Sequence, residues 1–501
     1  MRQFSSLVTE LAARGHEVHV AFQPTKGELD DAAKQPGVTH GFAPARSESD
    51  GWRSVAWLVR GLADLARYAH PRFQRAPLLR ERMTAKITGR LRKSDEFDPV
   101  GRKLALRLAR RLSAGPDAVL SERVIRAAAR LEEAIPTSGR IDRYIRERAP
   151  DVVLATPVVN RASTQVEFLK SARRLGIPAA TLVASWDNLT NKGLLKWAPE
   201  RVFVWNEIQR REAVDLHGMP AERVVATGAQ LFDPWFERRP TTERDQFVRR
   251  IGLDPAEPYV LYTCSNPAMT ETPESGFVLE WLDALRSAGD ERLRRIGIAV
   301  RPHPNDHGRW LDVDLSGFGN VAVWPREGTL PVTDDARADF FDSLAHSAAV
   351  VGINTTAMIE AAIVGKSVLT VLAREFAQES TLHFDYLLEE NGGFLHVASS
   401  LAEHTVQLSH VLDEDAAGAE RRRRFVEAFV RPHGLDQAAT PILADAIEEL
   451  ATLRVERSVR PSRVLLRAPL AVEAALCVLA AKRPSRTGRR KARRIGAPAE
   501  G

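Results

Sequence analysis

Residues 349–371 read AVVGINTTAMIEAAIVGKSVLTV. Two short apolar runs, 349–351 and 368–371, are typical of buried strands, and the segment between them has the spacing of a helix. Gly365 and Lys366 provide a helix end and a turn before the second run. A strand, a helix and another strand in this order predict a parallel βαβ unit, which indicates an α/β fold.

The same alternation continues on both sides of this unit. Further strands are expected at 259–263, 296–300, 321–323 and 394–397, and in the first half at 16–22, 151–155, 179–183, 201–204 and 224–227. Helices are expected at 163–175, 207–217, 340–346, 356–364, 402–412, 416–430 and 438–453. Short apolar strands separated by helices indicate parallel sheets with right-handed crossovers.

The length of 501 residues is too great for one hydrophobic core. A charged segment, 237–244, interrupts the alternation and is interpreted as an interdomain linker. We therefore expect an N-terminal Rossmann-like domain at 1–236 and a C-terminal Rossmann-like domain at 245–455, followed by a basic tail with a short apolar helix at 456–501.

Two features of the N-terminal domain depart from the usual doubly wound pattern. Residues 50–148 are basic and have helical spacing, for example at Trp57, Leu58 and Leu62, which predicts a helical insertion. The chain also begins in an amphipathic helix, 1–14, whereas such a domain normally begins with a strand and a glycine-rich turn. The first strand is therefore expected to be missing from this sequence, and a genuine variant of the fold that has lost an edge element is the alternative.

The composition narrows the class of protein. Hydrophobic residues make up 44% and charged residues 27%, as in ordinary globular proteins. The net charge is +6, but zinc-finger spacing, an RRM signature and a basic zipper are all absent from the sequence, so we expect no nucleic-acid partner. The two cysteines, Cys264 and Cys477, form neither a disulfide framework nor a metal cluster and fit a reducing cytosol, which predicts a cytoplasmic protein.

The tail leaves two interpretations open. Its apolar run, 468–481, contains Glu473 and is too short to predict a membrane span. Because Arg463 and Arg467 precede the run and a basic segment follows it, the helix fits the surface of an anionic membrane, peripheral to its inner face. A helix packed on the protein, followed by a basic end, explains the same residues.

Polar side chains that follow strands are the candidate site residues, since ligands of open parallel sheets bind beyond the carboxyl ends of the strands. Arg301-Pro302-His303-Pro304 follows one strand. Arg301 has the planar guanidinium suited to a phosphate, and His303 can donate a hydrogen bond or a proton near neutral pH. A rigid turn with an exposed histidine is the simpler alternative.

The loop that follows the predicted strand 349–351 is the second candidate. Asn354, Thr355 and Thr356 precede its helix and can cap it, and the free N–H groups there are suited to phosphate. Glu360, one turn later, is placed to bind ribose hydroxyls. The third candidate is the loop after strand 368–371, where Arg374 is expected near the phosphates.

The fourth candidate lies in the first domain. Asp187, in the loop 185–192, is placed to act as the base that deprotonates an acceptor hydroxyl, and an Asx-turn is the alternative. No metal ion or other cofactor is expected. The nearest approach to a cation cluster is a group of aspartates whose spacing fits a solvated loop and helix start: Asp334, Asp335, Asp339 and Asp342.

Three stretches together resemble one superfamily. These are RPHP after a second-domain strand, GINTTAMIEAAIVGKSVLTV after it, and RVFVWNEIQRREAVDLHGMPAERVVATGAQLFD at the end of the first domain, where Gly228 is followed by Asp233. They are similar to GT-B glycosyltransferases, nearest to CDP-glycerol glycerophosphotransferase-like and capsule-polysaccharide transferases and to UDP-N-acetylglucosamine 2-epimerases. The resemblance spans most of 1–440, is weak at 50–148 and is absent in the tail.

The resemblance implies two Rossmann-like domains facing a cleft. The second domain would hold a nucleotide-sugar or CDP-polyol donor, and the first a glycan or lipid-linked acceptor. Arg301 and His303 would meet the donor phosphates, Thr355 and Thr356 would add N–H groups, and Glu360 would hold the ribose. Such enzymes usually transfer their group without a metal ion.

The leading hypothesis is thus a transferase of glycosyl or polyol-phosphate groups in cell-surface polysaccharide or glycolipid biosynthesis. A non-hydrolysing UDP-sugar 2-epimerase is the first alternative, although its arginine-and-acid signature after strand 368–371 is matched only loosely, by Arg374, Glu375 and Glu379. An inactive GT-B-like scaffold or binding protein is the second alternative, and the missing first strand is the reason to consider it.

Overall fold

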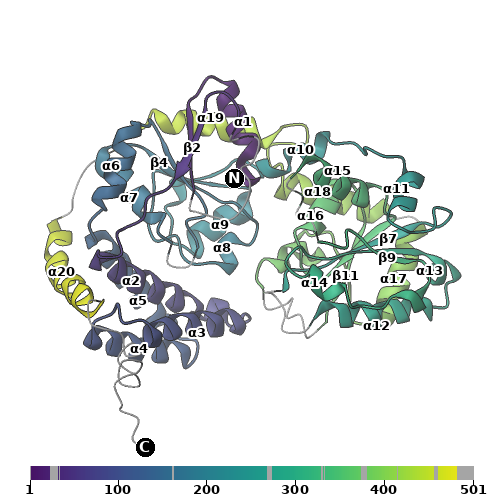
Figure 1. The fold of residues 1–501 in the computed structure, drawn as a ribbon, viewed down its shortest axis with the longest axis horizontal. Coiled ribbons are helices and arrows are strands. Elements are labelled where there is room, and N and C mark those ends of the chain that lie inside the picture. Colours follow the sequence, from purple (N-terminus) through teal and green to yellow (C-terminus); the bar gives the residue numbers. More distant parts are fainter. Residues whose placement is uncertain are drawn as a thin grey trace, which may run out of the picture.

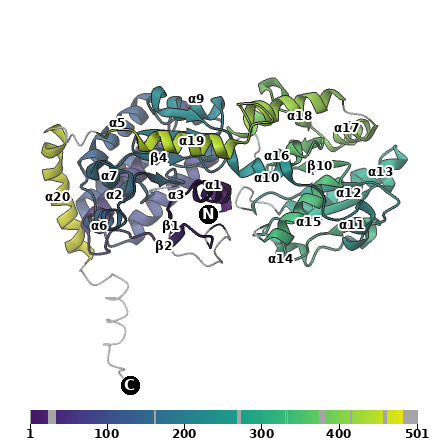
Figure 2. The same cartoon turned by 90° about the horizontal axis from the view of Figure 1, so that it is seen from above.

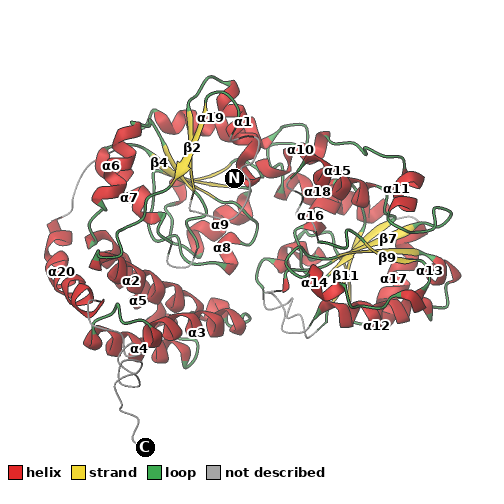
Figure 3. Cartoon of the chain, in the orientation of Figure 1, coloured by secondary structure: helices red, strands yellow, loops and turns green. Residues whose placement is uncertain are grey.

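The computed structural model describes residues 2–22, 32, 34–160, 163–267, 273–328, 331, 333–373, 381–413, 416–455 and 461–481. Figure 1 shows two α/β bodies side by side, one formed mainly by the first half of the chain and one by the second. Each has a sheet with helices packed around it (Figure 3). This confirms the predicted α/β class with parallel sheets in two domains.

The second domain contains one six-stranded parallel sheet in the order β12-β11-β10-β7-β8-β9. Its strands are β7 (Tyr259–Thr263), β8 (Gly297–Arg301), β9 (Val321–Val323), β10 (Ala349–Gly352), β11 (Val368–Val371) and β12 (His396–Ala398). The order reverses between β7 and β10, as in the Rossmann fold, and a crevice forms at the carboxyl ends of strands where the order reverses.

Helices cover both faces of this sheet. They are α11 (Arg244–Arg250), α12 (Glu274–Arg286), α13 (Glu291–Arg295), α14 (His307–Trp310), α15 (Asp334–Ala345), α16 (Ala357–Ile363), α17 (Leu401–Asp413) and α18 (Ala416–Phe429). Tyr262 and Trp281 belong to the hydrophobic core on one side of the sheet, and Leu261 and Met358 to the core on the other. The continuous apolar runs of the central strands follow from this double coverage.

The first domain has two parallel sheets. β1 (Val18–Phe22) pairs with β2 (Val38–Phe42), and a four-stranded sheet has the order β3-β4-β5-β6. The latter comprises β3 (Val153–Ala155), β4 (Ala179–Leu182), β5 (Arg201–Val204) and β6 (Val224–Ala226). The helices are α1 (Ser5–Ala13), α7 (Val166–Leu175), α8 (Asn188–Asn191), α9 (Glu207–Asp215) and α10 (Asp233–Glu237).

The predicted helical insertion is present as α2 (Gly51–Tyr68), α3 (Pro77–Lys93), α4 (Pro99–Ser113), α5 (Ala118–Ala134) and α6 (Gly139–Arg148). A buried ionic cluster joins it to the first domain. Arg60 of α2 donates to both carboxylate oxygens of Glu132 at 2.7 and 2.6 Å, and to Glu167 of α7 at 2.5 Å. Lys170 of α7 also pairs with Glu132, at 2.8 Å.

The chain returns to the first domain after completing the second. Helix α19 (Ala439–Ala451) packs against α1 (Figure 2). Its Leu443 and Ile447 lie in the same core cluster as Leu182 and Phe203 of the four-stranded sheet. We assigned this helix to the second domain from its place in the sequence.

Gly228 and Asp233 contact the segment that leads back to the first domain and the start of α19. The carboxylate of Asp233 accepts from Thr440 N at 2.7 Å, from Ala439 N at 3.0 Å and from Arg431 at 3.0 Å. Gly228 has φ +89° and a Cβ there would come 2.5 Å from the Cβ of Ala439, so this position requires glycine. The glycine-to-aspartate spacing noted in the sequence thus has a structural reason.

Buried His404 of α17 lies against Trp281, in the core that also contains Tyr262, and provides a test of that core. Neither ring nitrogen has a hydrogen-bond partner, and burial lowers the pKa of His404 to about 4. Below pH ~6.5 the unfolded chain binds a proton that the folded chain does not, so this histidine makes the protein less stable as pH falls from about 6.5 towards 4.

We expect His404→Leu to raise the free energy of unfolding by about 1–3 kcal/mol at pH 7 and to flatten its fall below pH ~6.5. Urea unfolding followed by circular dichroism at several pH values measures both effects. His410→Leu, at an exposed position on the same helix, is the control. A His404→Leu protein with the stability and pH profile of the wild type contradicts the interpretation.

Candidate active site

A cavity of about 380 Å³ lies between the two domains. The second domain lines it with the ends of β7, β8 and β10, at the point where the strand order reverses. The first domain lines it with Ser185 and Trp205, which follow β4 and β5, and with Gln3 and Ser6 near its start. The carboxyl ends of both parallel sheets therefore face one cleft, as predicted.

Arg301 ends β8 and is 8% exposed. One Nη lies 3.3 Å from the carboxylate of Asp339, and the guanidinium carbon is 4.6 Å from the ring centre of Phe340. Burial lowers the pKa of Arg301, and Asp339 opposes that effect. The side chain remains a cation at neutral pH, since an arginine does not lose its proton in a folded protein.

His303 lines the cavity two residues later. Its Nδ1 accepts a hydrogen bond from the backbone N–H of Asn305 at 3.1 Å. Burial lowers the pKa of His303, with Asp306 opposing, so the imidazole is neutral at pH 7. Because Nδ1 is the acceptor, the proton resides on Nε2, which makes His303 a hydrogen-bond donor through that atom.

The loop after β10 contributes Thr355, Thr356 and Glu360 to the cavity. Thr355 Oγ1 accepts from Ala357 N at 3.4 Å. Gly352 is required where β10 passes β7, because a Cβ there would come 2.9 Å from Thr263 Oγ1. Helix α16 has only two turns, so the predicted contribution of its N-terminus to phosphate binding is small.

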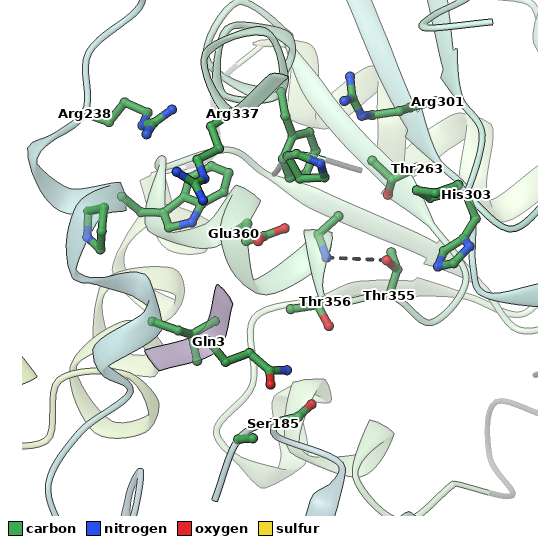
Figure 4. A pocket seen from close by; sticks show the side chains of 18 of the residues that line it. Gln3, Ser185, Arg238, Thr263, Arg301, His303, Arg337, Thr355, Thr356 and Glu360 are labelled. Atoms are coloured by element: carbon green, nitrogen blue, oxygen red, sulfur yellow. Dashed lines mark hydrogen bonds between the residues drawn. The ribbon is translucent and has the colours of Figure 1, made fainter. Parts of the chain in front are cut away.

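Two further arginines line the cavity. They were not predicted from the sequence, because the candidates there were polar residues that follow strands. Arg238 follows α10 in the linker, and Arg337 lies in the first turn of α15. Burial and the nearby cation of Arg337 lower the pKa of Arg238. Figure 4 shows Arg238 and Arg337 on one side of the cavity, His303 and Thr355 on the other, and Glu360 between them.

No protein-family model and no curated protein matches the sequence. Solved structures show a distant likeness. UDP-GlcNAc 2-epimerase from Neisseria meningitidis bound to UDP-GlcNAc is 14% identical, covers 65% of this chain and 82% of its own, and has a TM-score of 0.43. WaaG, a glycosyltransferase involved in lipopolysaccharide biosynthesis, is 13% identical, covers 90% and 95%, and has a TM-score of 0.44. The wall teichoic acid polymerase TagF is 14% identical, covers 51% and 59%, and has a TM-score of 0.35.

The strand order, the all-parallel pairing in both domains and the cavity between their carboxyl edges decide the architecture. The fold is of the GT-B type. Within this GT-B cleft the structure brings together five of the residues selected from the sequence: Arg301, His303, Thr355, Thr356 and Glu360.

Two other selected residues, Asn354 and Asp187, are not among the described residues that line the cavity. Asn354 contacts its own domain, since its N–H donates to Ser265 Oγ and its side-chain amide to Thr381 Oγ1, each at 3.1 Å. Arg374 lies outside the described residues. Asp187 is hydrogen-bonded to Ser185, which does line the cavity, and its carboxylate is 3.2 Å from the ammonium of Lys192.

Burial raises the pKa of Asp187. The charges of Lys192 and His383 and a hydrogen bond from Ser185 lower it by a larger amount, so the net shift of the pKa is downward. Asp187 is therefore ionised at neutral pH. Ser185, which lines the cavity, connects it with this carboxylate. His383 of the second domain packs edge-on against Trp186, with ring centres 4.6 Å apart, and this contact fixes the Asp187 loop against the facing domain.

Two aspartates of α15, Asp339 and Asp342, make structural contacts within the protein. Asp342 is fully buried and accepts from the backbone N–H and hydroxyl groups of Thr241 and Thr242, at 2.7–3.1 Å, which fixes the linker. Asp339 accepts from the indole of Trp324 at 3.0 Å and pairs with Arg250 at 2.9 Å, in addition to Arg301. The prediction of a solvated acidic segment was wrong for these two residues.

Proposed function

We propose that this protein transfers a glycosyl or polyol-phosphate group from a nucleotide-activated donor to a hydroxyl acceptor in cell-surface polysaccharide or glycolipid biosynthesis. The charge of the cavity is the main support. Three guanidinium groups line it, from Arg238, Arg301 and Arg337, and Glu360 is the only carboxylate among the described lining residues. The positive charge of Arg337 lowers the pKa of Arg238, and an anionic diphosphate or phosphate diester between the two guanidinium groups would relieve that repulsion.

The donor would bind on the second-domain side. Its phosphates would lie among Arg301, Arg337 and the Nε2–H of His303, with Glu360 accepting from ribose hydroxyls. In the transfer, the acceptor oxygen forms a bond to the anomeric carbon or to phosphorus, and the bond to the departing phosphate oxygen breaks. The arginines stabilise the negative charge that this oxygen gains.

The acceptor would approach from the first-domain side, past Gln3 and Ser185. We propose Asp187 as the group that receives the acceptor proton, through the hydroxyl of Ser185. Its lowered pKa makes it a weak base that is always ionised, which suits a step where proton transfer follows bond formation.

A donor screen tests this proposal. Calorimetric titration with UDP, CDP and GDP and with their sugar or polyol esters is expected to find one base that binds, and that donor is expected to release its nucleotide only with an acceptor present. Interconversion of the sugar without an acceptor would identify an epimerase instead. Failure of every nucleotide to bind would identify a scaffold or binding protein.

A further inference from the structure

The helix α20 (Pro461–Ala481) is docked along the edge of the first domain, far from the cleft (Figures 1 and 2). It packs against α2 and α5. Helices α2 and α20 are in close contact, because a Cβ on Gly51 of α2 would overlap with the backbone carbonyl of Ala474 of α20. Arg467 Nε donates to the carbonyl of Ala134 at 3.1 Å. One face of α20 is therefore fixed to the protein.

The opposite face of α20 is exposed and entirely apolar. Leu465 is 79% exposed, Val472 61% and Leu479 57%. Every exposed residue from 465 to 481 is apolar: Leu465, Ala468, Pro469, Ala471, Val472, Ala475, Leu476, Leu479 and Ala481. A surface helix normally turns its polar side outwards, so this pattern is the reverse of the usual one.

Helix α4 extends the apolar face. Gly101 lies against α20, since a Cβ there would overlap with the carboxylate of Glu473. The neighbouring Val100 is 67% exposed and Leu104 57%. Six of the ten large hydrophobic side chains that are exposed in the described part of the chain thus lie on these two adjoining helices. We call them the α4–α20 face.

Exposed cations of α4 lie beside this face, and the one acid of α20, Glu473, is partly buried. Glu473 lies 3.8 Å from the sulfur of Cys477, and burial raises its pKa. Helix α4 adds exposed basic side chains at Lys103, Arg107, Arg110 and Arg111. In the sequence, Arg463 and Arg467 occur within α20, and eight Lys or Arg residues without an acid occupy 482–494.

We propose that the α4–α20 face docks on an anionic lipid bilayer, with α20 lying in the plane of the headgroups. An apolar strip edged by Lys and Arg matches a surface whose interior is apolar and whose headgroups are negative. A second copy of the chain is a poorer match, because a symmetric contact would bring two sets of these cations together. No helix in the described ranges has both the length and the apolar character to cross a bilayer.

Vesicle sedimentation tests this docking. The full-length protein is expected to sediment with vesicles of phosphatidylcholine and phosphatidylglycerol, far less with phosphatidylcholine alone, and less as salt is raised. Val472→Asp with Leu479→Asp is expected to weaken binding by about tenfold or more, since a charge on the inserted face must be dehydrated. Both positions are exposed, so the fold, checked by circular dichroism, is expected to persist.

Val406→Asp is the matched control, because Val406 is 56% exposed on α17 of the other domain. It is expected to bind vesicles as the wild type does. The proposal is overturned if the wild type does not bind anionic vesicles, if the double variant binds as well as the wild type, or if sedimentation velocity without lipid shows a dimer that the double variant abolishes. These assays contain no nucleotide, so their failure leaves the proposed function unaffected.

Discussion

Replacing Arg60 with methionine is expected to lower the free energy of unfolding by about 3–5 kcal/mol. Arg60 is 3% exposed and donates to Glu132 and Glu167, which are each 1% exposed. Burial raises the pKa of Glu132, but Arg60 and Lys170 lower it to about 2. Without Arg60, the cations that the described residues still place against these two buried carboxylates are Lys170 at Glu132 and Arg46 at Glu167.

Urea unfolding followed by circular dichroism measures this loss. Arg130→Met, at an exposed position of α5, is the control and is expected to change stability by less than about 0.5 kcal/mol. If Arg60→Met does not fold, Arg60→Lys keeps the charge without the planar fork and is expected to lose part of the stability. Stability within about 0.5 kcal/mol of the wild type for Arg60→Met would mean that the cluster is not coupled to folding.

The second large effect concerns the cleft. Arg301→Ala is expected to weaken binding of the donor nucleotide by about 10–100-fold, since a charge-assisted hydrogen bond contributes roughly 1.5–3 kcal/mol. The fold is expected to persist, because Asp339 retains Trp324 and Arg250 as partners. Calorimetric titration with the nucleotide identified in the donor screen provides the measurement.

Arg309→Ala is the control for this variant. Arg309 is 55% exposed, pairs with Asp306 near the same loop and is absent from the described lining of the cavity. Its loss is expected to leave binding within about twofold of the wild type. Equal binding by Arg301→Ala and the wild type would remove Arg301 from the donor site, while the control shows whether any nearby positive charge suffices.

The central strands of the second domain could be predicted because they are buried on both faces. The runs YVLYT and VLTV are mostly apolar and fully buried, and β7 and β11 have the predicted bounds, as does the partly buried edge strand β9. Strand β2 was missed because Thr39 and His40 point to solvent in a two-stranded sheet, so no apolar run marks it. The place of α19 was also not predictable, since its apolar stripe does not indicate which domain it will cover.

The residues of the candidate site also differ in how far the sequence predicts them. Arg301, His303 and Glu360 were found because the ends of neighbouring parallel strands meet at one edge of a sheet. Arg238 and Arg337 were missed because neither follows a strand: Arg238 comes after α10 in the linker, and Arg337 lies in the first turn of α15. Their positions in the sequence therefore gave no signal that they line the cavity. The roles assigned to these residues remain predictions.

The return of α19 to the first domain has a consequence for synthesis on the ribosome. The core that contains Leu182 and Phe203 is completed by Leu443 and Ile447, so the amino-terminal domain cannot close before the second domain has emerged. At about 5–20 residues per second, this delay is on the order of ten to forty seconds. During that time the four-stranded sheet exposes apolar side chains, to which ribosome-associated chaperones are expected to bind.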